Sequence, residues 1–189
     1  LFNRVPAKHL SSKYGFTPDA RWAAHLLRSA VRLSSGGSGS FVSPDGLVMT
    51  NHHVGSDALQ KLSTKEKNLL DTGFVARTRE EELACPDLEI LALVAIEDVT
   101  VRVNGAVPAG ADPAAANKAR REIMATIEKE SKDATGLQSE AVTLYQGGEY
   151  HLYRYKRYAE VKLVMAPETA IAFFGGDVDN FEFPRFDLD

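Results

Sequence analysis

The segment GGSGSFVSPDGLVMTNHHV, residues 36–54, decides the expected fold. Two short β-prone runs, residues 41–43 and 47–50, flank a Pro-Asp-Gly turn at residues 44–46. Proline fixes φ in such a turn, and glycine accepts the positive φ that the turn requires. The segment therefore predicts a β-hairpin over residues 39–50.

Two adjacent histidines, His52 and His53, follow the second strand of this hairpin. If the strand continues through them, their side chains point to opposite faces, so they are not expected to bind one metal ion together. A histidine at such a place suits a general base, because imidazole titrates near neutral pH. The residues alone leave a second interpretation open, in which one histidine is solvated and the other is a satisfied core residue.

Apolar periodicity and turn signals predict the other elements. We expect a helix that starts at residues 17–19 and runs to Leu33, and a short helical stretch over 56–70. A second long helix should run from Asp112-Pro113 to about Lys132. The predicted β segments are 88–103, 141–145, 150–156 and 159–165. This order predicts a mainly β fold that carries helices at its start and as an insertion.

The composition predicts a soluble globular domain, or one domain and a fraction. The 189 residues include 26 acidic and 22 basic side chains, for a net charge of −4, and 44% of residues are apolar. This mild acidity gives no support for nucleic-acid binding. No apolar run approaches the ~18 residues that span a bilayer. The single cysteine, Cys85, is expected to be a buried or free thiol, and His9, His25 and His151 are expected on the surface or on helix faces.

Residues 39–54 resemble the first hairpin of chymotrypsin-fold serine peptidases. In HtrA-type members a Gly-Ser-Gly strand turns back through a glycine and ends in Thr-Asn-x-His-Val, and the histidine is the catalytic base. This resemblance implies that His53 is the general base. An orienting carboxylate is then needed, and Asp87 lies at a spacing that suits the HtrA-type order.

The segment FGGDVDNFEFPRFDLD, residues 174–189, resembles a second signature, that of the bacterial dipeptidyl-peptidase family of the seven and eleven type. That pattern reads Phe-Gly-Gly-Asp-x-Asp-Asn-Trp-x-Trp-Pro-Arg, followed after three residues by the triad aspartate. The resemblance implies that Asp189 orients His53, and that Asn180 and Phe181 hold the α-amino group of the substrate. Phe181 stands where the family has a tryptophan, so the ring is kept and the indole N–H donor is lost.

The family resemblance implies a chymotrypsin-like double β-barrel that is incomplete in this chain. Its expected parts are an N-terminal helical segment, the first barrel strands with His53, a helical insertion and further strands that end at Asp189. These parts correspond to residues 1–35, 36–103, 112–134 and 137–189.

The implied function is that of a serine-type dipeptidyl aminopeptidase, which releases dipeptides from free peptide N-termini. No Gly-x-Ser-Gly segment follows Asp189 in the sequence. We therefore expect the chain to be the N-terminal portion of a longer peptidase, and to be inactive by itself because a triad without serine lacks the covalent route. The other interpretations are an HtrA-like endopeptidase that uses Asp87 and a non-catalytic, peptidase-derived binding module.

Peptides with a free N-terminus are the expected partners, and neither a metal nor an organic cofactor is expected. The family resemblance also implies a homodimer of the complete protein. Together with a first residue that is not methionine, it implies a periplasmic or exported protein whose signal peptide has been removed.

Overall fold

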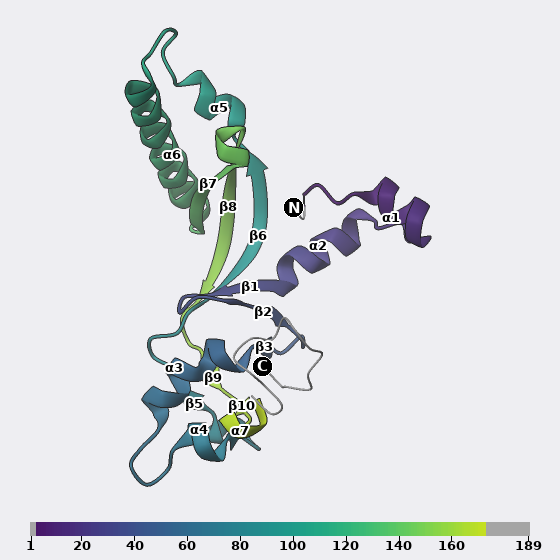
Figure 1. Cartoon of the computed structure of the whole chain (residues 1–189), viewed down its shortest axis with the longest axis vertical. Helices are drawn as coiled ribbons and strands as arrows, with labels where there is room; N and C mark the ends of the chain where they lie inside the picture. The colour runs from purple at the N-terminus through teal and green to yellow at the C-terminus, as the bar shows by residue number, and fades with distance from the viewer. Residues whose placement is uncertain (1–2, 173–189) are drawn as a thin grey trace. The chain divides into compact units, whose positions relative to one another are not determined.

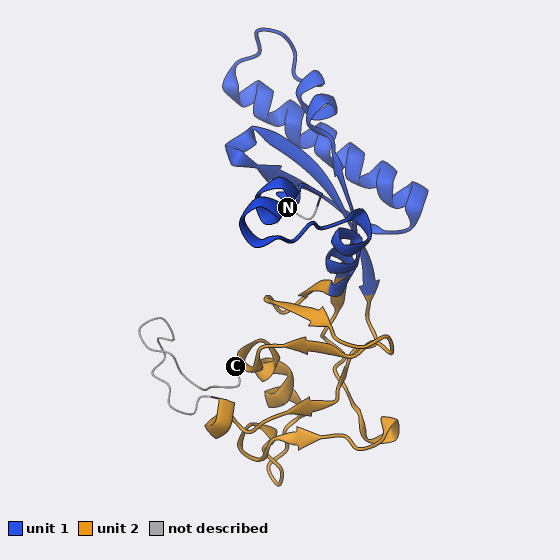
Figure 2. Ribbon diagram, turned by 90° about the vertical axis from the view of Figure 1, so that its right-hand side faces the viewer, with its two compact units in different colours: residues 1–29, 92–157 blue, residues 30–91, 158–189 orange. Residues whose placement is uncertain are grey.

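The computed structural model describes residues 3–172 (Figure 1). The chain divides into two compact units, one made of residues 1–29 and 92–157 and the other of residues 30–91 and 158–189 (Figure 2). They are called unit 1 and unit 2 below. None of the helices within residues 3–172 is both long and apolar enough to cross a lipid bilayer.

Unit 1 combines helices with long antiparallel strands. Its elements are α1 (Ala7–Tyr14), α2 (Ala20–Ser29), most of β6 (Ile90–Asp98), α5 (Thr100–Gly105), α6 (Pro113–Thr135), β7 (Gln138–Leu144) and most of β8 (Glu149–Tyr158). Strand β8 lies between β6 and β7, and its register with β7 runs from Gln138↔Tyr155 to Leu144↔Glu149.

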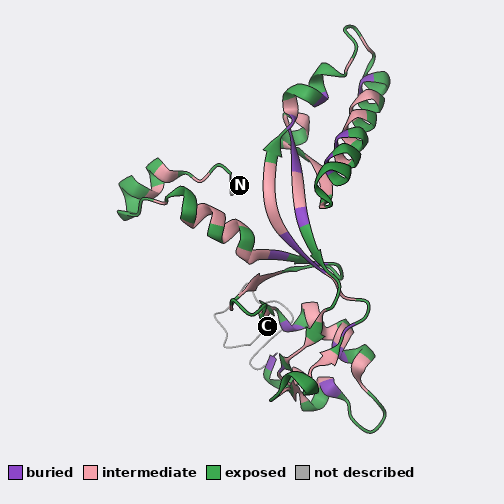
Figure 3. Cartoon of the chain, turned by 180° about the vertical axis from the view of Figure 1, so that it is seen from behind, coloured by how far each residue is buried: buried purple, intermediate pink, exposed green. Residues whose placement is uncertain are grey.

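The core of unit 1 forms where β8 meets α5 and α6. Its buried residues are Val99, Val103, Ile127, Tyr150 and Leu152, with Ile123 and Met124 packed against them. The buried stretch of β8 is drawn in purple in Figure 3. Burial of these apolar side chains stabilises the unit, at about 25 cal/mol for each Å² removed from water.

Helix α6 begins where the sequence predicts it. The Asp112 side chain accepts hydrogen bonds from the backbone N–H groups of Ala114 and Ala115, at 2.9 and 3.0 Å, and Pro113 occupies the first turn. The Asp112 carboxylate thereby satisfies two of the backbone N–H donors that have no partner within the first turn of a helix. The helix ends at Thr135 and is capped by Gly136, whose φ of 70° is the left-handed conformation that glycine adopts easily.

Unit 2 is built from shorter pieces around a second core. Its elements are β1 (Ala30–Leu33), β2 (Ser38–Phe41), β3 (Val48–Thr50), α3 (His52–Leu62), α4 (Leu69–Thr72), β4 (Phe74–Val75), β5 (Leu83–Ala84), β9 (Lys162–Leu163), β10 (Met165–Ala166) and α7 (Thr169–Ala172). Strands β1, β2 and β3 form an antiparallel meander, with Val31 opposite Gly39 and Gly39 opposite Thr50. Leu59, Leu69 and Ala166 form the buried core between α3, α4 and β10.

Several predicted elements are confirmed. The hairpin over residues 39–50 appears as β2 and β3, and the predicted β segments 141–145 and 150–156 appear as β7 and β8. Cys85 is a buried free thiol, and burial raises its pKa, a shift that a backbone hydrogen bond from Leu163 partly offsets. His9 and His25 are exposed.

Other predictions need correction, because the described chain is a mixed α/β structure rather than a mainly β one. The first long helix ends at Ser29, and residues 30–33 form β1, in which buried Val31 and Leu33 alternate with exposed Arg32. That alternation is the period of a strand, so packing overrode the helical spacing. The predicted β segment 88–103 ends at Asp98 and continues as helix α5.

Candidate functional site

The two adjacent histidines lie in the first turn of a helix and not at the end of a strand. Strand β3 ends at Thr50, Asn51 is the N-cap with φ −72° and ψ 151°, and α3 begins at His52. The prediction of a strand through residues 50–54 is therefore wrong. His52 is buried, with 7% of its surface exposed, whereas His53 is exposed. The two imidazoles still face different surroundings, because neighbouring residues on a helix point about 100° apart.

Glycine residues place the start of α3 against the hairpin. A Cβ on Gly39 would lie 2.7 Å from the carbonyl oxygen of Met49, and one on Gly37, whose φ is +85°, would lie 2.6 Å from Cγ2 of Val54. The Thr50 hydroxyl donates to the carbonyl oxygen of Ser38 at 2.7 Å. Side chains at these two glycines would push the strands and the helix apart. The glycine-rich strand therefore fixes the position of the helical turn that carries His53.

The buried His52 ties this turn to the segment after β10. Its Nε2 lies 3.2 Å from the carbonyl oxygen of Pro167, which is hydrogen-bond distance. Within α3 itself, the hydroxyl of Ser56 donates to the carbonyl oxygen of His53 at 2.8 Å. The backbone at residues 52–53 is thus held by these two contacts while the His53 side chain stays open to solvent.

Asp87, the alternative orienting carboxylate, forms an ion pair with a lysine of α3. Its carboxylate is 71% exposed and lies 3.4 Å from Nζ of Lys61, near the C-terminal end of α3. His53 is in the first turn of that helix, and its backbone lies roughly 12 Å along the axis from the backbone of Lys61. The Lys61 ammonium is shared between Asp87 and Asp57, which lies 3.0 Å from Nζ, so the described partner of Asp87 is this lysine.

The remaining predicted site residues, Asp189, Asn180 and Phe181, lie outside the described residues. Their roles stay predictions.

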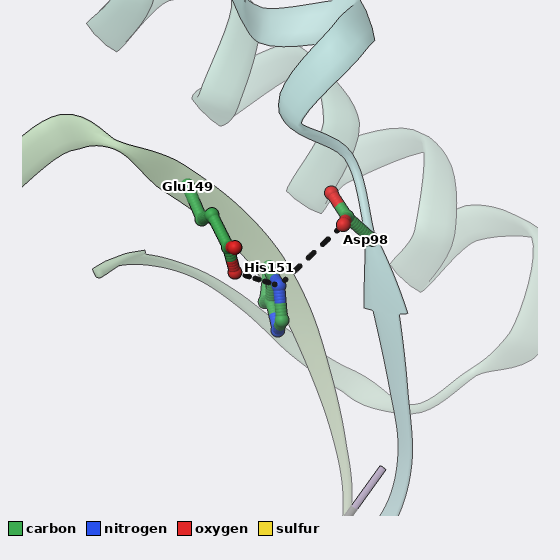
Figure 4. Close-up of side chains that lie close together, drawn as sticks. All are labelled: Asp98, Glu149 and His151. Atoms are coloured by element: carbon green, nitrogen blue, oxygen red, sulfur yellow. Dashed lines mark ion pairs between the residues drawn. The ribbon is translucent and has the colours of Figure 1, made fainter. Parts of the chain in front are cut away.

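A second group of polar side chains lies in unit 1, where the sequence did not predict it. His151, expected on the surface or on a helix face, is instead fully buried on strand β8, with 0% exposure. Its Nε2 lies 3.1 Å from Oε2 of Glu149 and 3.7 Å from Oδ2 of Asp98 (Figure 4). Glu149 and His151 are two residues apart on a strand, so both lie on one face. This spacing is the sequence signal from which the pair could have been predicted. The partner Asp98 comes from a distant strand and could not be read from local sequence.

The Asp98 carboxyl is held in its ionised form. Hydrogen bonds from Thr100 are the main cause that lowers its pKa, and the nearby His151 and Arg4 lower it further. Arg4 contacts the same group, with Nη1 2.7 Å from both Glu149 carboxylate oxygens and Nη2 3.1 Å from Oδ2 of Asp98. These three contacts anchor the residues before α1 to β6 and β8.

Comparison with known proteins shows which protein family the chain is related to. Residues 1–189 match the family model described as Peptidase S46. The chain is 36% identical over 170 residues to a dipeptidyl-peptidase 7 of Phocaeicola vulgatus, which covers 86% of this chain and 23% of the relative. It is 37% identical over 166 residues to an Asp/Glu-specific dipeptidyl-peptidase of Porphyromonas gingivalis, covering 84% of this chain and 23% of that relative. The chain therefore spans about a quarter of the length of these relatives.

A solved structure shows the same fold relationship. The crystal structure of Porphyromonas endodontalis DPP11 in complex with the dipeptide Arg-Asp matches with a TM-score of 0.78 and 29% identity, covering 99% of this chain and 28% of that one. The match to the family model extends over the whole sequence, including both segments from which the resemblance was first drawn. The chain belongs to the peptidase S46 family.

Proposed function

We propose that the protein containing this chain is a serine-type dipeptidyl aminopeptidase that releases dipeptides from peptides with a free N-terminus. The observation that carries the proposal is the similarity of most of the chain to relatives that are named dipeptidyl-peptidases. The finer fold proposed is a chymotrypsin-like double β-barrel, in which the β2–β3 hairpin belongs to the first barrel. The glycine-supported turn after this hairpin, which presents an exposed His53, supports it.

In the proposed mechanism His53 takes the proton of a serine hydroxyl as the serine attacks the scissile carbonyl. It then returns that proton to the leaving amine. Asp189 accepts the N–H of the other ring nitrogen of His53, which keeps the imidazole in the correct tautomer and stabilises its protonated form. The nucleophile is supplied by a serine outside these 189 residues.

Dipeptide release needs a group that binds the free α-ammonium of the substrate at a fixed distance from the scissile bond. The amide oxygen of Asn180 can accept a hydrogen bond from that ammonium, and the ring of Phe181 can pack beside it. Relatives named dipeptidyl-peptidase 7 and relatives named Asp/Glu-specific match the chain at similar identity, 36% and 37%. The two identities are too similar to favour either class of relative. The proposed substrates are therefore peptides with a free N-terminus, without a specified side chain before the cleaved bond.

Hydrolysis of dipeptidyl substrates by the complete protein tests the proposal. His53→Ala should lower kcat/KM by about 10⁴-fold, and Asp189→Asn should have an effect of the same order. The matched control is His25→Ala, an exposed histidine of unit 1, which should stay within about twofold of the unchanged protein. Full activity in the His53→Ala variant would refute the assignment.

The HtrA-like alternative makes opposite predictions. It requires Asp87→Asn to abolish activity, while Asp189→Asn has little effect, and it requires cleavage of peptides whose N-terminus is acetylated. The pairing of Asp87 with Lys61 at the far end of α3 favours the dipeptidyl-peptidase assignment. A complete protein that binds such peptides without cleaving them would instead indicate a binding module.

Export to the periplasm and assembly as a homodimer are further parts of the proposal, and both rest on the family resemblance. Cell fractionation tests the first, and light scattering coupled to size-exclusion chromatography tests the second. A cytoplasmic, monomeric protein would contradict them without affecting the assignment of His53.

A further inference from the structure

The polar cluster of unit 1 combines three potential metal ligands in a small space. Nε2 of His151, a carboxylate oxygen of Glu149 and one of Asp98 all lie within 4.8 Å of one another (Figure 4). His151 is fully buried, and among residues 3–172 neither of its ring nitrogens has a hydrogen-bond partner of good geometry. Because buried polar atoms are rarely left in that state, the cluster calls for an explanation beyond ordinary packing.

The backbone around the cluster is rigidly cross-linked. The hydroxyl of Thr100 accepts from the backbone N–H of Tyr150 at 2.9 Å, and the N–H of Val99 donates to the carbonyl oxygen of Tyr150 at 2.9 Å. The N–H of Thr100 donates to Oδ1 of Asp98 at 3.0 Å. That bond turns the other oxygen, Oδ2, toward His151. Ligands held by neighbouring groups in this way are typical of preformed metal sites.

The distances fit a four-coordinate ion. Zinc lies about 2.0–2.2 Å from nitrogen and oxygen ligands, so neighbouring ligand atoms of a tetrahedral site are about 3.3–3.6 Å apart. The two distances from His151 Nε2, 3.1 and 3.7 Å, bracket that range. The Asp98 and Glu149 side chains are 46% and 27% exposed, which leaves an open side for the ion and for water.

We propose that Asp98, Glu149 and His151 form a binding site for a divalent transition-metal ion of the Zn²⁺ type. The Arg4 guanidinium competes with this ion for the two carboxylates. Imidazole nitrogen combined with carboxylate oxygen suits Zn²⁺ and its neighbours, whereas Mg²⁺ and Ca²⁺ favour oxygen ligands alone. Nothing in this proposal depends on peptidase activity. Asp98 is far in sequence from Glu149 and His151, and the three residues follow no local metal-binding pattern, which is why sequence alone predicted no metal.

Arg4 occupies the same oxygens that the ion would use. Its guanidinium contacts Oε2 of Glu149 and Oδ2 of Asp98, and it brings one positive charge to two carboxylates. A divalent ion brings two positive charges and also bonds Nε2 of His151, which has no hydrogen-bond partner, from Arg4 or elsewhere, among residues 3–172. Binding of the ion therefore displaces Arg4, and with it the contact that anchors the residues before α1.

Zinc titration of the complete protein by isothermal calorimetry tests the site. Arg4→Ala should bind Zn²⁺ about tenfold more tightly than the unchanged protein, because the competing ion pairs are removed. Adding Glu149→Gln to Arg4→Ala should weaken binding at least about 100-fold, since a ligand itself is lost. The Gln variant keeps the side-chain volume at a partly exposed position, so it avoids the cavity that His151→Ala would open in the core.

Two further measurements separate this site from others in the protein. His25→Ala in the Arg4→Ala background should leave zinc affinity unchanged, because His25 is an exposed histidine of the same unit outside the cluster. Co²⁺ bound to Arg4→Ala should show the strong visible absorption of a four-coordinate ion, and adding Glu149→Gln should remove it. Zinc affinity that is unchanged by Glu149→Gln would overturn the site, and equal affinity in the unchanged protein and Arg4→Ala would overturn the competition by Arg4.

Discussion

At the scale of single residues, His52 and His53 show how neighbours in sequence take different roles. His52 is buried and lies within hydrogen-bond distance of the Pro167 carbonyl oxygen, whereas His53 is exposed. We therefore regard His52 as a positioning residue for His53. The contacted residue, Pro167, directly follows β10 and precedes, in sequence, the segment that contains Asn180 and Asp189.

Substitution of His52 separates a positioning role from a catalytic one. His52→Ala should lower kcat of the complete protein about 10–100-fold, because small displacements of a catalytic group are costly. His52→Gln offers an amide nitrogen near the position of Nε2, so it should restore a large part of that loss. The pH profile of kcat/KM should keep its shape in both variants if His53 is the titrating base. A changed profile, or no rescue by glutamine, would contradict the role.

At the scale of elements, the β2–β3 hairpin and the residues before it pack closely against α3. Gly36 and Gly37 both have positive φ, +97° and +85°, but only Gly37 faces a neighbour, the Val54 side chain. This pair allows the cost of the backbone conformation to be separated from the cost of the close contact. Val54 follows His53 directly, so the close contact bears on the candidate site.

Alanine substitutions at the two glycines should differ accordingly. Gly36→Ala should cost about 1–2 kcal/mol of local stability, the penalty for a left-handed conformation of a residue with a Cβ. Gly37→Ala adds the clash with Val54 and should cost about 2–5 kcal/mol. Hydrogen exchange of residues 36–54 measures the local stability, and kcat/KM should fall in the Gly37 variant far more than in the Gly36 variant. Equal effects of the two substitutions would show that Val54 moves aside freely.

At the scale of the whole molecule, the two units have separate buried cores. Leu59, 1% exposed, lies in the core of unit 2, and Leu152, 2% exposed, lies in the core of unit 1. Neither core cluster contains residues of the other unit. Each unit therefore has a buried apolar cluster of its own.

The pair Leu59→Ala and Leu152→Ala tests this separation. Each substitution should cost about 2–5 kcal/mol through lost burial and the cavity that remains. Hydrogen exchange should accelerate mainly in unit 2 for Leu59→Ala and mainly in unit 1 for Leu152→Ala. Equal acceleration of both units by either substitution would indicate a single cooperative unit.

The sequence by itself determined features that depend on neighbours along the chain. The Pro-Asp-Gly turn and the Asp112-Pro113 helix start act through local backbone geometry, so the hairpin, β7 and β8, and α6 could be predicted. The two motif segments could be read in the same way, and they pointed to the family of the chain. The predicted helix that continued through residues 30–33 failed because a four-residue strand takes its identity from the strand beside it.

Only the tertiary structure decided features that depend on distant contacts. Burial of His52 comes from its packing near Pro167, and burial of His151 comes from the sheet around β8. The cluster of Asp98, Glu149 and His151 with Arg4 joins residues far apart in sequence; Arg4 and Glu149, for example, are 145 positions apart. Local spacing cannot report such meetings, because folding brings those side chains together only through the packing of whole elements.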